Sequence, residues 1–153
     1  MSEKELTIKK IKNGTVIDHL PAGSSTSVAK ALGIHKNCEY TVAVAMNVKG
    51  KSGTKDIVKI EDKILRPKEI NRLALIAPKA TINIIKDYTV AEKKKVEVPD
   101  EIEDSIKCAN PNCVTNQGEP IVPLFTVESK DPIRLRCKFC ERIMEKDLIE
   151  EQL

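Results

Sequence analysis

The sequence predicts an α+β protein built from two small domains, and three observations lead to this fold class. The first 98 residues alternate β-branched, apolar runs with two short helical patterns, in the order βαββαβ. Residues 99–153 contain short β-like runs among prolines, with few apolar residues for a core. Four of the five cysteines lie in this second part as two close pairs, which indicates a unit stabilised by a metal.

The first strands and the first helix occupy the N-terminal part of the chain. Residues 5–12 and 14–20 are rich in β-branched residues, and the Asn13-Gly14 pair between them is typical of a bend or a hairpin turn. A short helix is expected over residues 24–32, because serines and a threonine offer N-cap oxygens and apolar residues then recur at helical spacing. Gly33 ends this pattern.

The next two runs, residues 40–48 and 54–61, flank a polar turn and predict a β-hairpin. The turn contains Gly50-Lys51-Ser52, which is part of the pattern of a phosphate-binding loop. That loop needs a glycine where Ala45 stands and a helix directly after the motif. Because a strand follows instead, we interpret the motif as a hairpin turn.

A second helix and a last strand complete the predicted domain. Pro67 suits the first helical position, and an apolar stripe at helical spacing continues to Ala77, just before Pro78. Residues 80–86 predict a strand, with residues 88–90 as its extension. The order βαββαβ is typical of a ferredoxin-like sheet with both helices on one face.

The composition changes over residues 96–104, where a proline and an acidic run mark the expected linker. We therefore divide the chain into domains of residues 1–98 and 99–153. In the second domain, residues 121–127 and 133–136 are β-like. A domain this poor in apolar residues normally needs additional stabilisation, which a bound metal can provide.

The strongest motif is formed by Cys108 and Cys113 together with Cys137 and Cys140. Each pair lets a tight turn aim two sulfurs at one point, so the spacing predicts one four-coordinate Zn²⁺ site. Buried free thiols and a redox pair in the second turn are the alternatives. A closed shell leaves no position for a substrate, so we expect structural zinc and assign no catalytic residue. Cys38 is expected to be a small buried apolar residue.

Charge differs in sign between the two parts of the chain. Residues 1–99 carry 19 basic and 11 acidic side chains, a net +8, whereas residues 100–153 carry 7 and 12, a net −5. The basic part favours an anionic ligand, and the acidic part argues against nucleic-acid binding there. Four aromatic residues in the chain are also too few for a base-stacking platform.

The basic residues of the first part allow two interpretations. Asp18 and His19 lie at the end of the first strand region, and Lys59 and residues 93–95 lie on or after later strands. They form either a solvated basic face or a site in which lysines contact phosphates while Asp18 and His19 bind a sugar or base. Composition leaves both open.

The chain contains no uncharged apolar run of about 18 residues, so no membrane segment is predicted. Its N-terminus lacks the apolar region of a secretory signal. A cytoplasmic location is therefore expected.

Five segments carry a resemblance to a known family. They are residues 14–19, 55–61, 73–78 and 80–83, and the four cysteines with their spacing. Over nearly its full length the chain resembles the regulatory chain of aspartate carbamoyltransferase. The resemblance implies a non-catalytic subunit that controls pyrimidine biosynthesis by binding CTP and ATP at one site. It also implies that two such chains pair, and that a zinc domain binds the catalytic chain and joins catalytic trimers.

The resemblance implies particular residues for each site. The nucleotide site would contain Ile11, Asp18, His19, Lys59, Asn83, Ile85, Tyr88, Val90 and Lys93. Backbone groups near Ile11 and Tyr88 would contact the base, Lys59 the ribose or a phosphate, and Lys93 the phosphate tail. Contacts with the catalytic chain would come from Asn110, Asn112, Lys138 and Glu141. A zinc-ribbon protein that binds nucleic acid is the alternative function.

Overall fold

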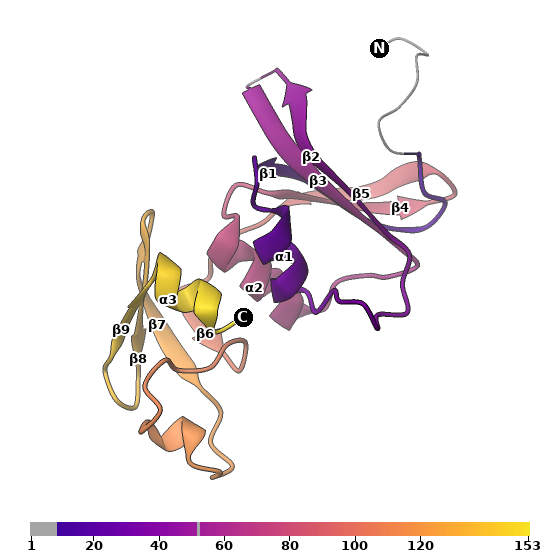
Figure 1. Ribbon diagram of the computed structural model, residues 1–153. Helices are drawn as coiled ribbons and strands as arrows, with labels where there is room; N and C mark the ends of the chain where they lie inside the picture. Colours follow the sequence, from indigo (N-terminus) through magenta and orange to yellow (C-terminus); the bar gives the residue numbers. More distant parts are fainter. Residues whose placement is uncertain (1–8, 52) are drawn as a thin grey trace.

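The computed structural model describes residues 9–51 and 53–153, which form two antiparallel sheets (Figure 1). The strand order is β2-β3-β1-β4-β5 in the first sheet and β6-β7-β8-β9 in the second. Strands β4, β1, β3 and β2 have the predicted ferredoxin-like arrangement, to which β5 adds a fifth strand. The predicted α+β class is confirmed.

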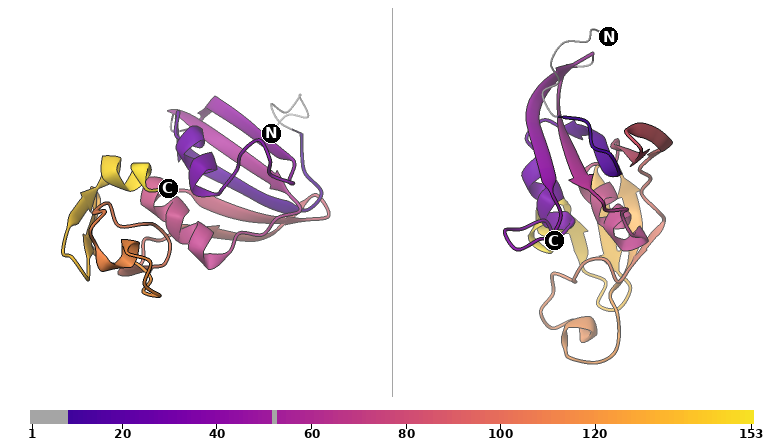
Figure 2. Two further views of the ribbon diagram at one scale, coloured as in Figure 1. Left: turned by 60° about the horizontal axis from the view of Figure 1, so that its bottom comes forward. Right: turned by 90° about the vertical axis from the view of Figure 1, so that its right-hand side faces the viewer.

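The first sheet carries two helices on one face (Figures 1 and 2). Its elements are β1 (Gly14–Pro21), α1 (Ser25–Ala31), β2 (Val42–Gly50), β3 (Gly53–Glu61), α2 (Pro67–Ile76), β4 (Thr81–Lys86) and β5 (Thr89–Lys95). The predicted hairpin and both predicted helices are confirmed. Alternate residues of the central strands, such as Ile17, Val58 and Ile82, are buried against Val28 and Leu73 of the helices.

Strand β5 corrects the sequence-based description of this region. Residues 88–90 do not extend β4; instead, Asp87 and Tyr88 form the turn between two strands, with φ of 49° and 68°. Positive φ at both turn residues matches the twist of a tight hairpin. All residues of β5 are exposed, so the strand lacks the apolar alternation that marks a half-buried one. Residues 9–12 are not in a strand, and the rest of the predicted strand 5–12 lies outside the described residues.

The N-terminus of α1 is capped by a distant carboxylate and not by the serines that precede it. Asp56 of β3 is fully buried, and its Oδ2 accepts the Ser25 N–H at 3.0 Å. Its Oδ1 accepts the Asn47 N–H at 2.9 Å. Burial alone would raise the pKa of Asp56, but backbone N–H groups of Asn47, Gly23 and Ser25 hold it below its ordinary value. One side chain thus fixes α1 to both β2 and β3.

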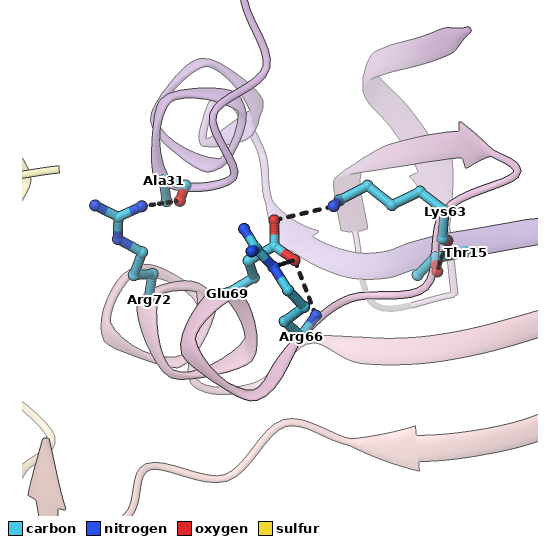
Figure 3. Close-up of polar contacts among 6 residues, drawn as sticks. All are labelled: Thr15, Ala31, Lys63, Arg66, Glu69 and Arg72. Atoms are coloured by element: carbon cyan, nitrogen blue, oxygen red, sulfur yellow. Dashed lines mark hydrogen bonds and ion pairs between the residues drawn. The ribbon is translucent and has the colours of Figure 1, made fainter. Parts of the chain in front are cut away.

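Glu69 performs a similar task at the start of α2 (Figure 3). Its carboxylate accepts the Arg66 N–H at 2.8 Å, as expected of an acidic residue in the first turn, and lies 3.2 Å from Lys63 Nζ. Glu69 is buried, which alone would raise its pKa; these donors outweigh burial and lower the pKa. The Thr15 hydroxyl donates to the Lys63 carbonyl at 2.6 Å, which attaches this corner to β1.

The second sheet belongs to the cysteine-rich part of the chain. Its elements are β6 (Glu101–Glu103), a 3₁₀ turn (Val114–Asn116), β7 (Leu124–Lys130), β8 (Ile133–Cys137), β9 (Ile143–Glu145) and α3 (Lys146–Glu151). Phe125, Leu135 and Met144 are fully buried in its core. Leu75 of α2 joins the same core, so the two sheets are packed together through α2.

The expected linker, residues 96–104, is partly structured: Val96 and Val98 are buried in the first core, and Glu101–Glu103 form a strand of the second sheet. The expectation that Cys38 is buried is wrong. Cys38 is only half-buried, with its thiol 3.7 Å from the Tyr40 carbonyl oxygen. Among the described residues, no helix combines the length and apolar character needed to cross a bilayer.

Candidate nucleotide and metal sites

The outer face of the first sheet, the face away from α1 and α2, carries a row of paired residues from four strands. Lys59 of β3 pairs with Val16 of β1, which pairs with Asn83 of β4, which pairs with Lys93 of β5. The neighbours of Asn83 along β4, Ile82 and Ile84, are buried in the core. Because successive side chains alternate between faces, this central row projects outward.

A second row lies two residues further along the strands and is charged. It contains Asp18, Thr81 and Lys95, which pair across β1, β4 and β5. Asp18 forms an ion pair with Lys55, whose Nζ lies 3.0 Å from the carboxylate. The register of β1 shifts between Ile17 and Leu20, and His19 adopts a positive φ of 59° there. This bulge brings His19 Nδ1 to 3.0 Å from Thr81 Oγ1.

A third row lies at the opposite end of the central row and is apolar. Gly14 pairs with Ile85, which pairs with Val90. Tyr88, in the turn after β4, is exposed and donates its backbone N–H to the Lys12 carbonyl at 2.9 Å. Ile11, the residue before Lys12, is buried. Seven of the nine residues assigned to the nucleotide site thus lie in these rows or at the β1 bulge, ordered from apolar to charged, and the turn residue Tyr88 follows the apolar end.

A cavity of about 880 Å³ opens at the charged end. Of the residues assigned from the sequence, His19 and Lys93 line it. The described lining residues include five lysines and no acidic residue: Lys51, Lys55, Lys79, Lys93 and Lys95. Lys95 is one of the lysines that the sequence offers for a phosphate site, whereas sequence reasoning missed Lys51, Lys55 and Lys79 as site residues. Strand alternation could have found Lys55, which lies four residues before Lys59.

The charges in the two polar rows are tuned by their surroundings. Burial alone would raise the pKa of Asp18, but the Lys55 ammonium and the His19 backbone N–H lower it, so the carboxylate is ionised at neutral pH. Burial lowers the pKa of Lys59, and Lys10 adds to this effect while Asp18 opposes it. Lys59 Nζ donates to the Lys9 carbonyl at 3.1 Å. The carboxylate of Asp18 offsets only part of the positive charge of the lysines on this face. An anionic ligand bound beside it would offset more of that charge.

The four cysteines of the second domain converge on one point. All four sulfurs lie within 4.8 Å of one another, with Cys108 and Cys140 3.6 Å apart and Cys113 and Cys137 3.7 Å apart. A tetrahedral shell with metal–sulfur bonds of about 2.3 Å has sulfur–sulfur separations of about 3.8 Å. The cluster therefore fits Zn²⁺, held by all four sulfurs with no open position.

Burial of the sulfurs disfavours their thiolate forms unless a cation is bound. Burial raises the pKa of Cys108 to about 12 and raises the pKa of Cys137. At Cys140, burial is outweighed by the Arg142 backbone N–H and the Asn110 side chain, and its pKa falls to about 7. A dication compensates the cost of burying several thiolates in this core. The turn is also fixed by Asn116, which donates to the carbonyls of Cys108 and Asn110 at 3.0 and 2.8 Å.

The residues assigned to catalytic-chain contact lie beside these turns. Asn112, Lys138 and Glu141 are exposed, and Asn110 is half-buried. Lys138 pairs with Glu101 within the chain, and Asn110 Oδ1 accepts the Asn112 N–H at 3.0 Å. Exposed apolar side chains lie on the same turns or between them along the chain, which sequence reasoning missed: Val114, Ile121, Val122 and Phe139.

Comparison with known proteins identifies the family to which both domains belong. A family model described as the allosteric domain of the aspartate carbamoyltransferase regulatory chain matches residues 6–97. A second, described as the metal-binding domain of the same chain, matches residues 100–150. The aspartate carbamoyltransferase regulatory chain of Thermococcus sibiricus is 51% identical over 98% of this chain and 99% of its own length. That of Pyrococcus furiosus is 52% identical over 95% and 96%. The chain therefore belongs to the family of aspartate carbamoyltransferase regulatory chains, which are the non-catalytic chains of that enzyme.

Proposed function

We propose that this regulatory chain binds CTP and ATP in competition on the outer face of its five-stranded sheet, and thereby controls the first committed step of pyrimidine biosynthesis. The observation that carries the proposal is the gradient across the three rows, from apolar through polar to lysine-rich. A nucleoside triphosphate has the same gradient along its length, from a flat base through a sugar to a polyanion.

The gradient fixes the direction of the bound nucleotide. The base lies near Ile11, Ile85, Tyr88 and Val90, where backbone groups contact its edge. Successive rows on one face are about 6.8 Å apart, so the ribose reaches Asp18, Lys59 and Asn83. The phosphates then meet His19, Lys93 and the other lysines of the cavity. Lysine suits this task because its ammonium is a compact charge that follows a flexible phosphate chain.

The second domain, which we place at residues 99–153 after an allosteric domain of residues 1–98, binds the catalytic chain. One structural Zn²⁺ held by the four cysteines supports the two turns that carry Asn110, Asn112, Lys138 and Glu141. Because the metal fixes these turns, it fixes the side chains that they present to the partner. No contact with nucleic acid or membrane is part of this function, and a cytoplasmic location agrees with it.

Competition calorimetry on the full-length chain tests the nucleotide site. CTP is expected to give a saturable heat that ATP abolishes, and the reverse titration is expected to give the same dissociation constants. Saturable CTP heat that persists under saturating ATP would show two separate sites and contradict the shared one.

Strand β2 supports a proposal for self-association. It is an edge strand of the first sheet, and its Val44 and Met46 are 46% and 47% exposed. Pairing with a second copy across a two-fold axis would cover this apolar edge. We expect Val44→Lys to shift the chain to monomers in sedimentation, because two lysines would then meet at the dimer axis. Val122→Lys, a similarly exposed site in the second domain, is the control. An unmodified chain that is monomeric at tens of micromolar contradicts the proposal.

A further inference from the structure

Helix α1 lies between the lysine cavity and the second domain, and polar side chains hold it at both ends. At its N-terminus, the buried Asp56 carboxylate accepts the Ser25 N–H at 3.0 Å. The residue before Asp56 on β3 is Lys55, which lines the cavity and pairs with Asp18 at 3.0 Å. The charged end of the candidate nucleotide site is therefore one residue away from the group that caps α1.

At its C-terminus, α1 is held by Arg72 of α2 (Figure 3). Arg72 Nη1 donates to the Ala31 carbonyl at 3.3 Å, and Nε of the same guanidinium donates to the Ser105 carbonyl at 2.6 Å. Ser105 is buried and lies in the bend that follows β6 of the second domain. Arg72 thus joins the last turn of α1 to the cysteine-rich domain, where Lys30 Nζ of the same turn makes a longer, exposed contact with the Glu150 carbonyl at 3.4 Å.

We propose that α1 transmits nucleotide binding to the second domain, and that Arg72 is the positioning residue that makes this transmission possible. This inference rests on the nucleotide function proposed above. It names the route by which the effect of nucleotide binding is carried toward the catalytic chain. Phosphates entering the cavity compete with Asp18 for Lys55. The resulting shift of β3 moves the Asp56 carboxylate, and with it the N-terminus of α1. Arg72 passes the movement of Ala31 to Ser105.

The chemistry of both links suits such a route. The Asp56 carboxylate accepts backbone N–H groups of Ser25 and Asn47, so it ties the start of α1 to β2 as well as to its own strand. The Arg72 guanidinium is a planar fork that donates in two fixed directions, which a lysine or a glutamine does not reproduce. A positive group at the C-terminal carbonyls of a helix is also favourable electrostatically. Apolar contacts between the domains, such as those of Leu75, hold the domains together. They lack the directional geometry of the Arg72 hydrogen bonds.

The test is Arg72→Gln in the complex reassembled with the cognate catalytic chain. We expect zinc content, stoichiometry and CTP affinity to change by less than about twofold, while the effect of CTP and ATP on activity falls by about two- to 30-fold, the range for residues that carry coupling. Lys68→Gln is the matched control. Lys68 is one turn earlier on α2 and pairs with Asp104 across the same domain boundary, but the pair is exposed, so its loss should leave the response intact.

Three results would overturn the role of Arg72. They are an unchanged nucleotide response in Arg72→Gln, an equal loss in Lys68→Gln, or a loss of CTP affinity that explains the lost response. A wild-type complex that binds no nucleotide would instead contradict the proposed function alone. In that case, hydrogen exchange still tests the link.

The exchange measurement follows the amides of Leu32, Gly33 and Ile34, which donate to carbonyls of α1 at 3.0, 3.2 and 2.8 Å. Removing zinc should accelerate their exchange in the wild type. In Arg72→Gln they should already exchange faster, with a smaller further change on zinc removal. Equal acceleration in both proteins would show that Arg72 does not join α1 to the second domain.

Discussion

Zinc removal is expected to unfold residues 100–153 and release the catalytic chain, while the five-stranded sheet stays folded. Cys108, Cys113 and Cys137 are buried within the second core itself, together with Phe125 and Leu135. A structural zinc contributes on the order of 10 kcal/mol to the folding of small domains, which a core of this size cannot replace. The first sheet has its own core and does not contain the metal ligands.

Cys113→Ala should reproduce the effect of a chelator. Circular dichroism should show loss of the second sheet, and affinity purification should recover no catalytic chain with the variant. Cys38→Ala is the control, because Cys38 is half-buried and lies outside the metal cluster. If Cys113→Ala co-purified with the catalytic chain at wild-type stoichiometry, the role given to the metal would be wrong.

Lys93→Ala is expected to weaken CTP and ATP binding alike. Lys93 belongs to the central row and lines the cavity, where it meets the phosphates that the two nucleotides share. A charge-assisted hydrogen bond at a solvated site contributes about 1–3 kcal/mol, which corresponds to a five- to 150-fold loss of affinity. Calorimetry on the full-length chain measures both affinities, and zinc content should not change.

The adjacent residue provides a control that keeps the charge count equal. Lys94 pairs with Ile82 of β4, which is buried beneath the helices, so Lys94 projects to the opposite face of the sheet from Lys93. Lys94→Ala should change nucleotide affinity by less than about twofold. Equal losses in the two variants would mean that the sheet attracts nucleotides by its overall charge and has no phosphate site at the central row.

Patterns with a strong local cause could be predicted from the sequence. The two cysteine pairs identify the metal cluster because tight turns and thiolate chemistry act over a few residues. The helix at Pro67 and the hairpin over residues 42–61 follow from apolar periodicity and turn residues. These features do not depend on distant parts of the chain.

Features made by distant contacts could not be predicted. Strand β5 exists because it pairs with β4, and its exposed, lysine-rich sequence has no apolar pattern of its own. Asp56 caps a helix 31 residues earlier in the chain, where local reasoning favoured the serines. Arg72 likewise reaches Ala31 and Ser105 only after the whole fold has formed. For the lysine cavity, alternation indicates the face of a strand on which a lysine lies, but only the pairing of β3, β1, β4 and β5 brings Lys55 to the same face as Lys93 and Lys95.

The most direct test of the account is the activity of the cognate catalytic chain, measured with and without this chain over increasing CTP and ATP. A catalytic trimer alone should ignore both nucleotides, and the isolated regulatory chain should have no activity. Assembly of the two should make activity depend on nucleotide, since a ligand that prefers one quaternary state shifts the equilibrium toward it. An assembled, zinc-loaded complex whose activity is unchanged at saturating CTP and at saturating ATP would contradict the account.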